Sequence, residues 1–299
     1  FTPYIFYRTT TTTTKRTKPT VLLLDEMMKR SVARTIDSGV LATVPLLGVL
    51  HPSPPVFFET VPKMFAAIGG PLLVLMCLAY WIFEFKSNVD QRIQGPRKKV
   101  PPIEKELYAT TKCTFVVACL SAWPVAMARV GLPIGLIWKL EDMGTAWYLV
   151  PVQMMLGIVV VDAWTYWKHR LLHTRYFYPF HMQHHTFNDP TCFAGFAVGP
   201  VESILTFCPL LLLCFEQAKH YAPLYYTAVV SFVLLNLYLH SGVTYVWMEF
   251  LLPKLGLNSS AWHNIHHSHV NANFGEVSYV WDLICSTSKT HYDKKRHLQ

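Results

Sequence analysis

Long apolar runs separated by short polar or basic stretches dominate this chain. Residues 64–83 form the clearest run, because no charged side chain interrupts it and a helix of this length crosses the ~30 Å apolar core of a bilayer. Four further runs predict membrane helices: residues 114–128, 146–167, 195–215 and 224–239. Whether the last two runs cross the membrane fully or only halfway stays open at this point. The pattern therefore predicts an all-α integral membrane protein, with a bundle of about four to five transmembrane helices.

The connecting segments predict how these helices are oriented. Residues 21–33 predict a short amphipathic helix at the membrane surface, with apolar positions on one side and basic positions on the other. Residues 86–105 form a basic polar connection, which faces the cytosol or the mitochondrial matrix by the positive-inside tendency. Residues 132–140 predict a partial dip into the membrane. If all five apolar runs cross, the basic connection and the histidines described below share one side.

The chain divides into three parts on this pattern. Residues 1–60 form a tail and an amphipathic segment, residues 61–290 a membrane-embedded domain, and residues 291–299 a polar C-terminal tail. No acidic residue precedes Asp25, and basic residues flank the threonines at residues 9–14, which is typical of an organellar transit sequence or of a plain polar tail. Such a segment has little to bury, so we expect a partner protein to hold it.

Composition and charge support the membrane prediction. Apolar residues make up 52% of the chain and charged residues 15%, which is unusual for a soluble enzyme of this size. The net charge of +8 fits basic loops that contact lipid head groups, so we expect no nucleic acid partner. None of the seven cysteines forms a Cys-x-x-Cys pair, which favours small core residues over zinc ligands or disulfides.

Eight histidines gather in three clusters near the ends of the apolar runs. The clusters are His169 and His173; His181, His184 and His185; and His263, His266 and His267. Residues three and four apart share one face of a helix, so each cluster presents its rings side by side. So many polar rings beside apolar segments would be costly without a cation to bind. A structural zinc needs four ligands, whereas eight or nine nitrogen ligands are enough for two metal ions with open positions.

Charged residues near the first cluster have distinct expected roles. Asp162 lies about two helical turns before His169 in an otherwise apolar run, where a carboxylate needs a partner. We expect it to accept the second ring N–H of a metal-ligating histidine, or else to line a water pocket. Lys168 and Arg170 are interpreted as anchors at the membrane interface. Four histidines without cluster partners are expected to be ordinary: His51, His220, His291 and His297.

The order His-x3-His, His-x2-His-His and His-x2-His-His resembles the fatty acid hydroxylase and sterol desaturase superfamily of membrane di-iron oxygenases. The resemblance covers roughly residues 86–287 and implies a histidine-rich helical cap on the cytosolic or matrix side that holds two iron ions. Members often carry another histidine at the position of His240, which makes it the expected ninth ligand, with a hydrogen-bonded structural role as the alternative. His269 follows the third cluster by two residues and is a weaker candidate.

The resemblance also implies an activity. We expect a lipid hydroxylase or desaturase that uses dioxygen, with electrons from NAD(P)H through a reductase and a cytochrome b5-type donor protein. The substrate class is a sterol, a sphingoid base or a fatty acyl chain that enters from the bilayer. Family habit favours the endoplasmic reticulum, while the basic, threonine-rich start favours the mitochondrial inner membrane.

Three positions depart from the family pattern. Gly199 begins Gly-Pro-Val-Glu where many relatives have His-Pro-x-Glu. In the closing segment, which is the run after the third histidine cluster up to Thr287, Leu283 and Ser286 stand where relatives have an arginine and a glycine. These departures leave open a rival reading, a non-catalytic accessory subunit of a membrane complex that keeps the fold. A membrane zinc hydrolase is disfavoured because no His-Glu-x-x-His motif is present.

Overall fold

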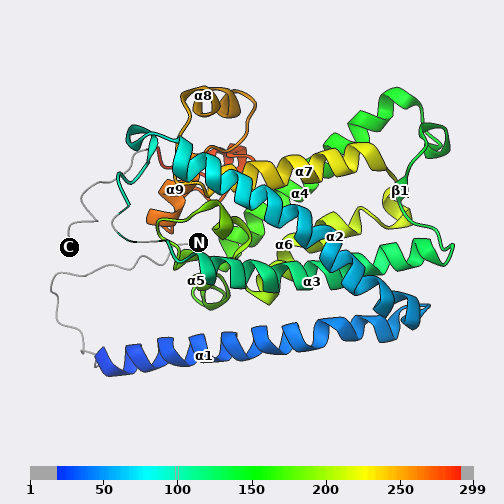
Figure 1. The fold of residues 1–299 in the computed structure, drawn as a ribbon, viewed down its shortest axis with the longest axis horizontal. Helices are drawn as coiled ribbons and strands as arrows, with labels where there is room; N and C mark the ends of the chain where they lie inside the picture. Colours follow the sequence, from blue (N-terminus) through cyan, green and yellow to red (C-terminus); the bar gives the residue numbers. More distant parts are fainter. Residues whose placement is uncertain (1–18, 98, 100, 291–299) are drawn as a thin grey trace.

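The computed structural model describes residues 19–97, 99 and 101–290, so the threonine-rich start, the expected partner contact of the tail, and His291 and His297 lie outside the described residues. The described chain is a bundle of helices with a single pair of two-residue strands (Figure 1). The long helices are α1 (Pro19–Thr43), α2 (Pro54–Tyr80), α3 (Ile103–Arg129), α4 (Val150–Leu172) and α7 (Ala222–Leu239).

Shorter elements complete the bundle. The short α-helices are α5 (Tyr178–His185), α6 (Pro200–Leu212), α8 (Val246–Lys254), α9 (Ser260–Ser268) and α10 (Val280–Ile284). The 3₁₀-helices are η1 (Val44–Leu50), η3 (Val89–Gln91), η4 (Leu140–Met143), η5 (Trp147–Leu149), η6 (Cys192–Phe196) and η7 (Glu216–Ala218), and η2 (Trp81–Lys86) is a π-helix. The strands β1 (Leu136–Ile137) and β2 (His220–Tyr221) pair in parallel.

Five helical segments of the described chain are long and apolar enough to cross a membrane, which confirms the expected fold class. They are Asp25–Leu50, Pro54–Lys86, Ile103–Arg129, Trp147–Leu172 and Ala222–Leu239. Each buries less than half of its apolar window inside the protein, so much of its surface is left for lipid.

The first of these segments corrects the prediction of a short surface helix at residues 21–33. The helix continues to Thr43 and, with η1, reaches Leu50. Charged residues hid its length, because Arg34 and Asp37 interrupt the apolar pattern. Asp37 is nevertheless accommodated, since its Oδ1 accepts a 3.0 Å hydrogen bond from Val201 N in the first turn of α6. A domain boundary after residue 60 would fall inside α2, which begins at Pro54.

For residues 195–215 the sequence left a full and a partial crossing open, and the structure favours the partial one because its helix is too short to span a membrane. η6 occupies the start of that segment, and α6 begins only at Pro200 and ends at Leu212. Pro200 is the first residue of α6. Its missing N–H costs nothing there, because the N–H groups of the first turn have no partner within the helix. The bend places Glu202 in the first turn of α6 and leaves Gly195 and Phe196 beside the histidines.

Helix α3 forms the centre of the bundle through its small side chains. It packs closely against α2, α6 and η6, and its buried positions are mostly alanine, cysteine and threonine. Small residues let neighbouring helix backbones approach, which is how helices associate where no hydrophobic effect drives them together. The buried small positions are Ala109, Thr110, Cys113, Thr114, Ala118, Cys119, Ala122 and Ala126.

The histidine-bearing segments lie at one end of the bundle and the β1–β2 pair at the other (Figure 1). The basic connection between α2 and α3 is at the histidine end, because Arg97 donates to the carbonyl oxygens of Asp189 and Pro190, just after α5. Gln94 Nε2 from the same connection lies 3.3 Å from Asn264 Oδ1 on α9. The basic residues and the histidines therefore share one end, although α1 rather than residues 195–215 supplies a crossing.

Candidate metal centre

Nine histidines converge at this end of the bundle from four parts of the chain. His169 and His173 come from the end of α4, three from α5, His240 from the residue after α7, and three from α9. They form two groups in which all candidate ligand atoms lie within 4.8 Å of one another. The five-histidine group is His169, His173, His181, His185 and His266; the four-histidine group is His184, His240, His263 and His267.

Short helices set the spacing of these rings. α5 and α9 are each just over two turns long and carry the pattern His-x2-His-His, so each contributes rings to both groups. Ser259 caps α9 by accepting from Trp262 N, which fixes where the helix begins. α4 and α7 each end at a ring of the centre, since His173 and His240 are their C-terminal caps.

Four of the rings have their Nδ1 atoms engaged by hydrogen-bond acceptors. Nδ1 of His169 donates to the carbonyl oxygen of Phe274 at 2.8 Å, and Nδ1 of His266 donates to that of Ala272 at 2.7 Å. Nδ1 of His240 lies 3.0 Å from the backbone oxygen of Asn236, one turn earlier in α7. A neutral ring that carries its proton on Nδ1 has a lone pair on Nε2. These contacts therefore turn Nε2 of each ring inward as a ligand atom.

The fourth ring, His181, donates from Nδ1 to the Glu202 carboxylate at 2.7 Å. Its Nε2 lies 3.1 Å from Nε2 of His169, and the two lone pairs face each other. Between neutral rings that contact is repulsive, because neither nitrogen has a proton to share. A cation bound by both nitrogens removes the repulsion.

The spacing of the remaining inner nitrogens agrees with this. Nε2 atoms of five further ring pairs lie 3.0–3.2 Å apart: His173 and His185, His185 and His266, His184 and His240, His240 and His263, and His263 and His267. Two nitrogen ligands at right angles on one ion at ~2.1 Å are themselves about 3 Å apart. The residues present therefore fit a pair of metal ions.

Burial keeps these rings neutral. Removal from water, strengthened by repulsion between neighbouring imidazoles, holds the pKa of His184, His263 and His267 well below its usual range. Burial lowers the pKa of His240 to about 4 and that of His266 to about 3. The neutral ring is the form that ligates a metal, so the centre is electrostatically prepared for cations.

The loop after α9 supplies both backbone carbonyls that orient His266 and His169. Asn273 lies between Ala272 and Phe274 with a positive φ of 58°, a conformation that asparagine tolerates better than most residues. Asp282 fixes the far side of this turn, since its carboxylate accepts from the backbone N–H groups of Phe274 and Gly275 at 2.9 and 2.8 Å. The closing segment thus positions the rings without contributing a ring of its own.

The structure places the other sequence candidates away from the two groups. His269 belongs to neither group, and its Nδ1 lies 3.1 Å from Ser268 Oγ. His51 contacts Ser53 and Trp123, and His220 lies in β2 near Gly157, at the opposite end of the bundle. The two groups of rings do not follow the three clusters in the sequence. His173 of the first cluster and His185 of the second both belong to the five-histidine group.

Asp162 has different partners from those expected. Its oxygens accept from Ser278 N at 3.1 Å and from Trp281 Nε1 at 3.0 Å, and none of the contacts found for it in the described residues involves a histidine. The carboxylate that accepts from a clustered ring is Glu202, which is only 2% exposed. In the sequence, Glu202 is a single acidic residue in an apolar run. The same feature made Asp162 a candidate, so this pattern could have found Glu202 as well. Asp162 instead ties α4 to the closing segment.

The structure also contradicts the interpretation of Lys168 as an anchor at the membrane interface. Its side chain is buried, and Nζ lies 2.6 Å from Glu276 Oε1 and 3.1 Å from Thr206 Oγ1. Glu276 Oε1 is in turn 3.6 Å from Nδ1 of His169. The ion pair therefore adjoins the five-histidine group, and no local feature of the sequence separates Lys168 from Arg170, which is not fully buried.

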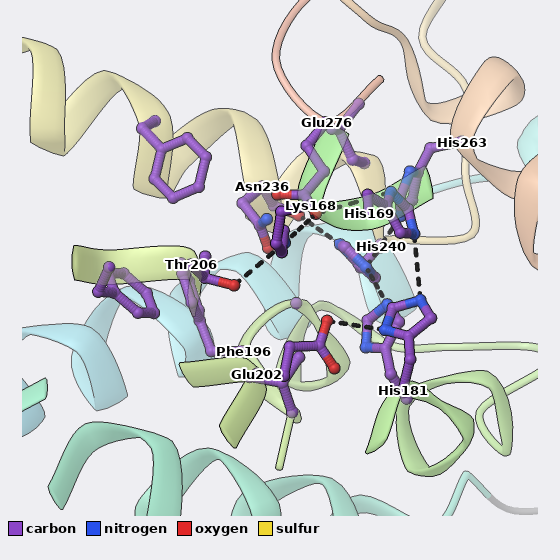
Figure 2. A pocket seen from close by; sticks show the side chains of 16 residues that line it. Lys168, His169, His181, Phe196, Glu202, Thr206, Asn236, His240, His263 and Glu276 are labelled. Carbon is purple, nitrogen blue, oxygen red and sulfur yellow. Dashed lines mark hydrogen bonds and ion pairs between the residues drawn. The ribbon is translucent and has the colours of Figure 1, made fainter. Parts of the chain in front are cut away.

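A narrow cavity of about 30 Å³ opens beside both groups (Figure 2). Five histidines line it together with five further polar side chains: Lys168, Glu202, Thr206, Asn236 and Glu276. The rest of its wall is apolar or small: Gly195, Phe196, Val198, Phe207, Phe232 and Leu239. Imidazole rings and apolar side chains thus meet in one space.

Comparison with known proteins agrees with this geometry. A model of the family described as fatty acid hydroxylase matches residues 154–287. A Delta(7)-sterol 5(6)-desaturase of Gibberella zeae is 30% identical over 219 residues, 70% of this chain and 59% of that protein. Lathosterol oxidase of Mus musculus is 30% identical over 158 residues, 50% of this chain and 48% of that protein.

A methylsterol monooxygenase of Aspergillus fumigatus is 24% identical over 227 residues, 71% of both chains. The chain spans about half to three fifths of the length of the desaturase and of the lathosterol oxidase. No solved structure matches the chain significantly. The histidine pattern, the family match and these relatives lead to one conclusion: the chain belongs to the fatty acid hydroxylase and sterol desaturase superfamily.

Proposed function

We propose that this protein is a membrane-embedded di-iron oxidoreductase that hydroxylates or desaturates a lipid with dioxygen. The observation that carries the proposal is the convergence of nine imidazoles into two adjacent groups beside an apolar-walled cavity. Neutral imidazole suits iron, copper and zinc, and membership of the superfamily favours iron.

Each group of rings holds one ion in this proposal. When bound, a pair of irons supplies the electrons and the open positions needed to activate dioxygen for attack on an unactivated C–H bond. The protein's own residues fix the rings: three backbone carbonyls and Glu202 hold the Nδ1 atoms, so the Nε2 atoms do not rotate away. Nearly complete burial of the rings excludes water from the reaction.

The lipid would reach the centre from the bilayer along the apolar wall of the cavity. Phe196, Phe207 and Phe232 offer the carbon skeleton an apolar surface next to His240 and His184. A volume of about 30 Å³ holds one or two water molecules, so these side chains move aside when the lipid enters. Their rings are joined to the backbone by two rotatable bonds each, which makes that movement feasible.

The relatives' names favour a sterol as the first substrate to test, ahead of a sphingoid base or a fatty acyl chain. We further propose that electrons come from NAD(P)H through a reductase and a cytochrome b5-type protein. The basic connection faces the cytosol if the protein resides in the endoplasmic reticulum and the matrix if it resides in the mitochondrial inner membrane.

Metal analysis of the purified protein tests the proposal. We expect two iron ions per chain, falling to about one in His173→Ala, which removes a ring of the five-histidine group, and also in His267→Ala from the four-histidine group. His51→Gln, at the opposite end, serves as the matched control and should retain both. Zinc or no bound metal in the wild-type protein would contradict the proposal.

Lipid profiling of a strain that lacks the protein separates the enzyme from its rival. A missing hydroxylated or desaturated lipid, restored by the wild-type protein but not by His173→Ala, supports the enzyme. An unchanged lipid profile together with loss of a large membrane complex supports an accessory subunit.

A further inference from the structure

The cavity contains polar side chains that the histidines do not use. Asn236, Thr206 and the Lys168–Glu276 pair lie together beside the rings, whereas Glu202 lies apart from them and contacts His181 (Figure 2). Glu276 Oε1 lies 3.6 Å from Nδ1 of His169, and no hydrogen bond between a ring and the side chain of Asn236, Thr206 or Lys168 is found in the described residues. A polar patch in an apolar cavity has an energetic cost unless it binds something polar.

Asn236 is the clearest member of this patch. It lies inside membrane helix α7 and is only 8% exposed, yet within the described residues its Oδ1 has no hydrogen-bond partner. The contact to His240 uses the backbone oxygen of Asn236, so the side-chain amide is not needed to orient that ring. An amide in such a place is destabilising until it finds a partner.

The fold keeps room for this amide. Gly195 lies against it, and a Cβ built on Gly195 would come within 2.3 Å of Asn236 Oδ1. Any larger residue at that position would displace the amide from the cavity wall. Gly195, in η6, is not among the glycines with a positive φ. Its lack of a side chain therefore permits the close approach of Asn236 and is not required by the backbone conformation.

The patch is neutral overall, which limits what it can bind. Lys168 and Glu276 neutralise each other at 2.6 Å, and Lys168 also donates to Thr206 Oγ1. Thr206 keeps its own O–H as a donor, and the Asn236 amide both donates and accepts. A hydroxyl group both donates and accepts too, whereas a carboxylate or phosphate would meet the acidic side chains of Glu276 and Glu202.

The position of the patch limits where that hydroxyl lies on the lipid. Asn236 is one helical turn before His240, a rise of ~6 Å along α7. A lipid held by Asn236 therefore presents to the rings a carbon only a few bonds from its hydroxyl. The apolar wall formed by Phe196, Phe207 and Phe232 receives the remaining skeleton.

We propose that Asn236 and Thr206 bind a neutral hydroxyl group of the lipid and so select substrates whose reacting carbon is a few bonds from that hydroxyl. This inference rests on the proposed function and narrows its substrate class. Sterols and sphingoid bases both offer such a group, and a simple fatty acyl chain does not.

Equilibrium binding to the metal-loaded protein in lipid nanodiscs tests the inference without requiring turnover. The probes are radiolabelled lathosterol and sphinganine, each paired with the same molecule whose hydroxyl groups are methylated. We expect the wild-type protein to bind one of the free hydroxyl compounds about 10-fold more tightly than its ether, the effect of a single buried hydrogen bond. The arm that shows the preference identifies the source of the hydroxyl.

Asn236→Leu removes the amide at similar volume and should abolish the preference by weakening binding of the free hydroxyl compound only. Thr206→Val should reduce the preference, and it provides a second variant if Asn236→Leu does not fold. Thr227→Val, on the exposed side of α7, is the matched control and should bind as the wild type does. Metal content is measured in every variant to show that the histidine groups are intact.

The two proposals fail in different ways. If the wild type binds neither alcohol more tightly than its ether, or if both patch variants keep the full preference, the inference is overturned even where the protein oxidises a lipid. A preference that depends on Asn236, in a protein that oxidises no lipid, sustains the hydroxyl site and contradicts the proposed oxidation.

Discussion

The carboxylate of Glu202 accepts a 2.7 Å hydrogen bond from Nδ1 of His181, and each of these side chains is only 2% exposed. The contact fixes the proton on Nδ1 and turns Nε2 toward the neighbouring rings. Glu202→Leu should therefore lower metal affinity about 10- to 100-fold, because the ring is then free to rotate and loses basicity. Competition with a chelator, followed by metal analysis, measures the change.

Glu202→Gln separates orientation from charge. Its side-chain oxygen still accepts from Nδ1, so this variant should recover most of the affinity lost in Glu202→Leu. Glu216→Gln, an exposed change outside the cavity, is the control. Unchanged affinity in Glu202→Leu would show that the contact does not orient the ring.

Ser286 follows Cys285, the C-cap of α10, and has a positive φ of 53°. Its N–H donates to the Leu283 carbonyl and the next N–H, of Thr287, donates to the Asp282 carbonyl, the helix ending in which glycine is preferred. Ser286→Gly should stabilise the protein by about 1 kcal/mol, because the left-handed conformation costs glycine little. Thermal unfolding in detergent measures it. Ser288→Gly, exposed and without a positive φ, should give no gain.

Gly199 lies under the Asp37 carboxylate, where a Cβ would come within 2.8 Å of Oδ2. Gly199→Ala should push this carboxylate off Val201 N and cost about 1 kcal/mol, as does loss of a helix cap. The readout is thermal unfolding together with protease sensitivity of α1. Gly39→Ala has no atom within 4 Å of the new Cβ and should be neutral or slightly stabilising. Equal behaviour of the two variants would contradict this account of the Gly199 departure.

Much of the bundle could be predicted because apolar length alone specifies a membrane helix. Residues 64–83 lie within the observed segment Pro54–Lys86, and residues 146–167 overlap the segment Trp147–Leu172 in all but their first residue. The prediction failed where single residues are decided by tertiary contacts. Arg34 and Asp37 read as polar breaks, but Asp37 caps α6 from within α1. The run at residues 195–215 has a continuous apolar pattern, but residues 195–199 pass along the cavity before α6 begins at Pro200.

The histidine clusters were visible because ligand spacing on a helix is a local property of the sequence. How the rings divide into two groups was not, since that division depends on how α4, α5, α7 and α9 meet. The partners of buried charges are equally non-local. Asp162 and Glu202 look alike in the sequence, yet only Glu202 reaches a ring. Lys168 finds Glu276 more than a hundred residues away.

The Lys168–Glu276 pair allows a test of buried charge near the centre. Its side chains are 2% and 13% exposed, so each charge depends on the other for compensation. Lys168→Met should destabilise the protein by about 3–5 kcal/mol because it leaves Glu276 uncompensated, and Glu276→Leu should act similarly. The double variant should be markedly more stable than the sum of the two single changes implies, since it removes both charges together. Unfolding of all four proteins in one detergent completes the cycle. Strictly additive losses would mean that the two charges are solvated independently, and the neutral patch inferred for hydroxyl binding would then need another source of compensation.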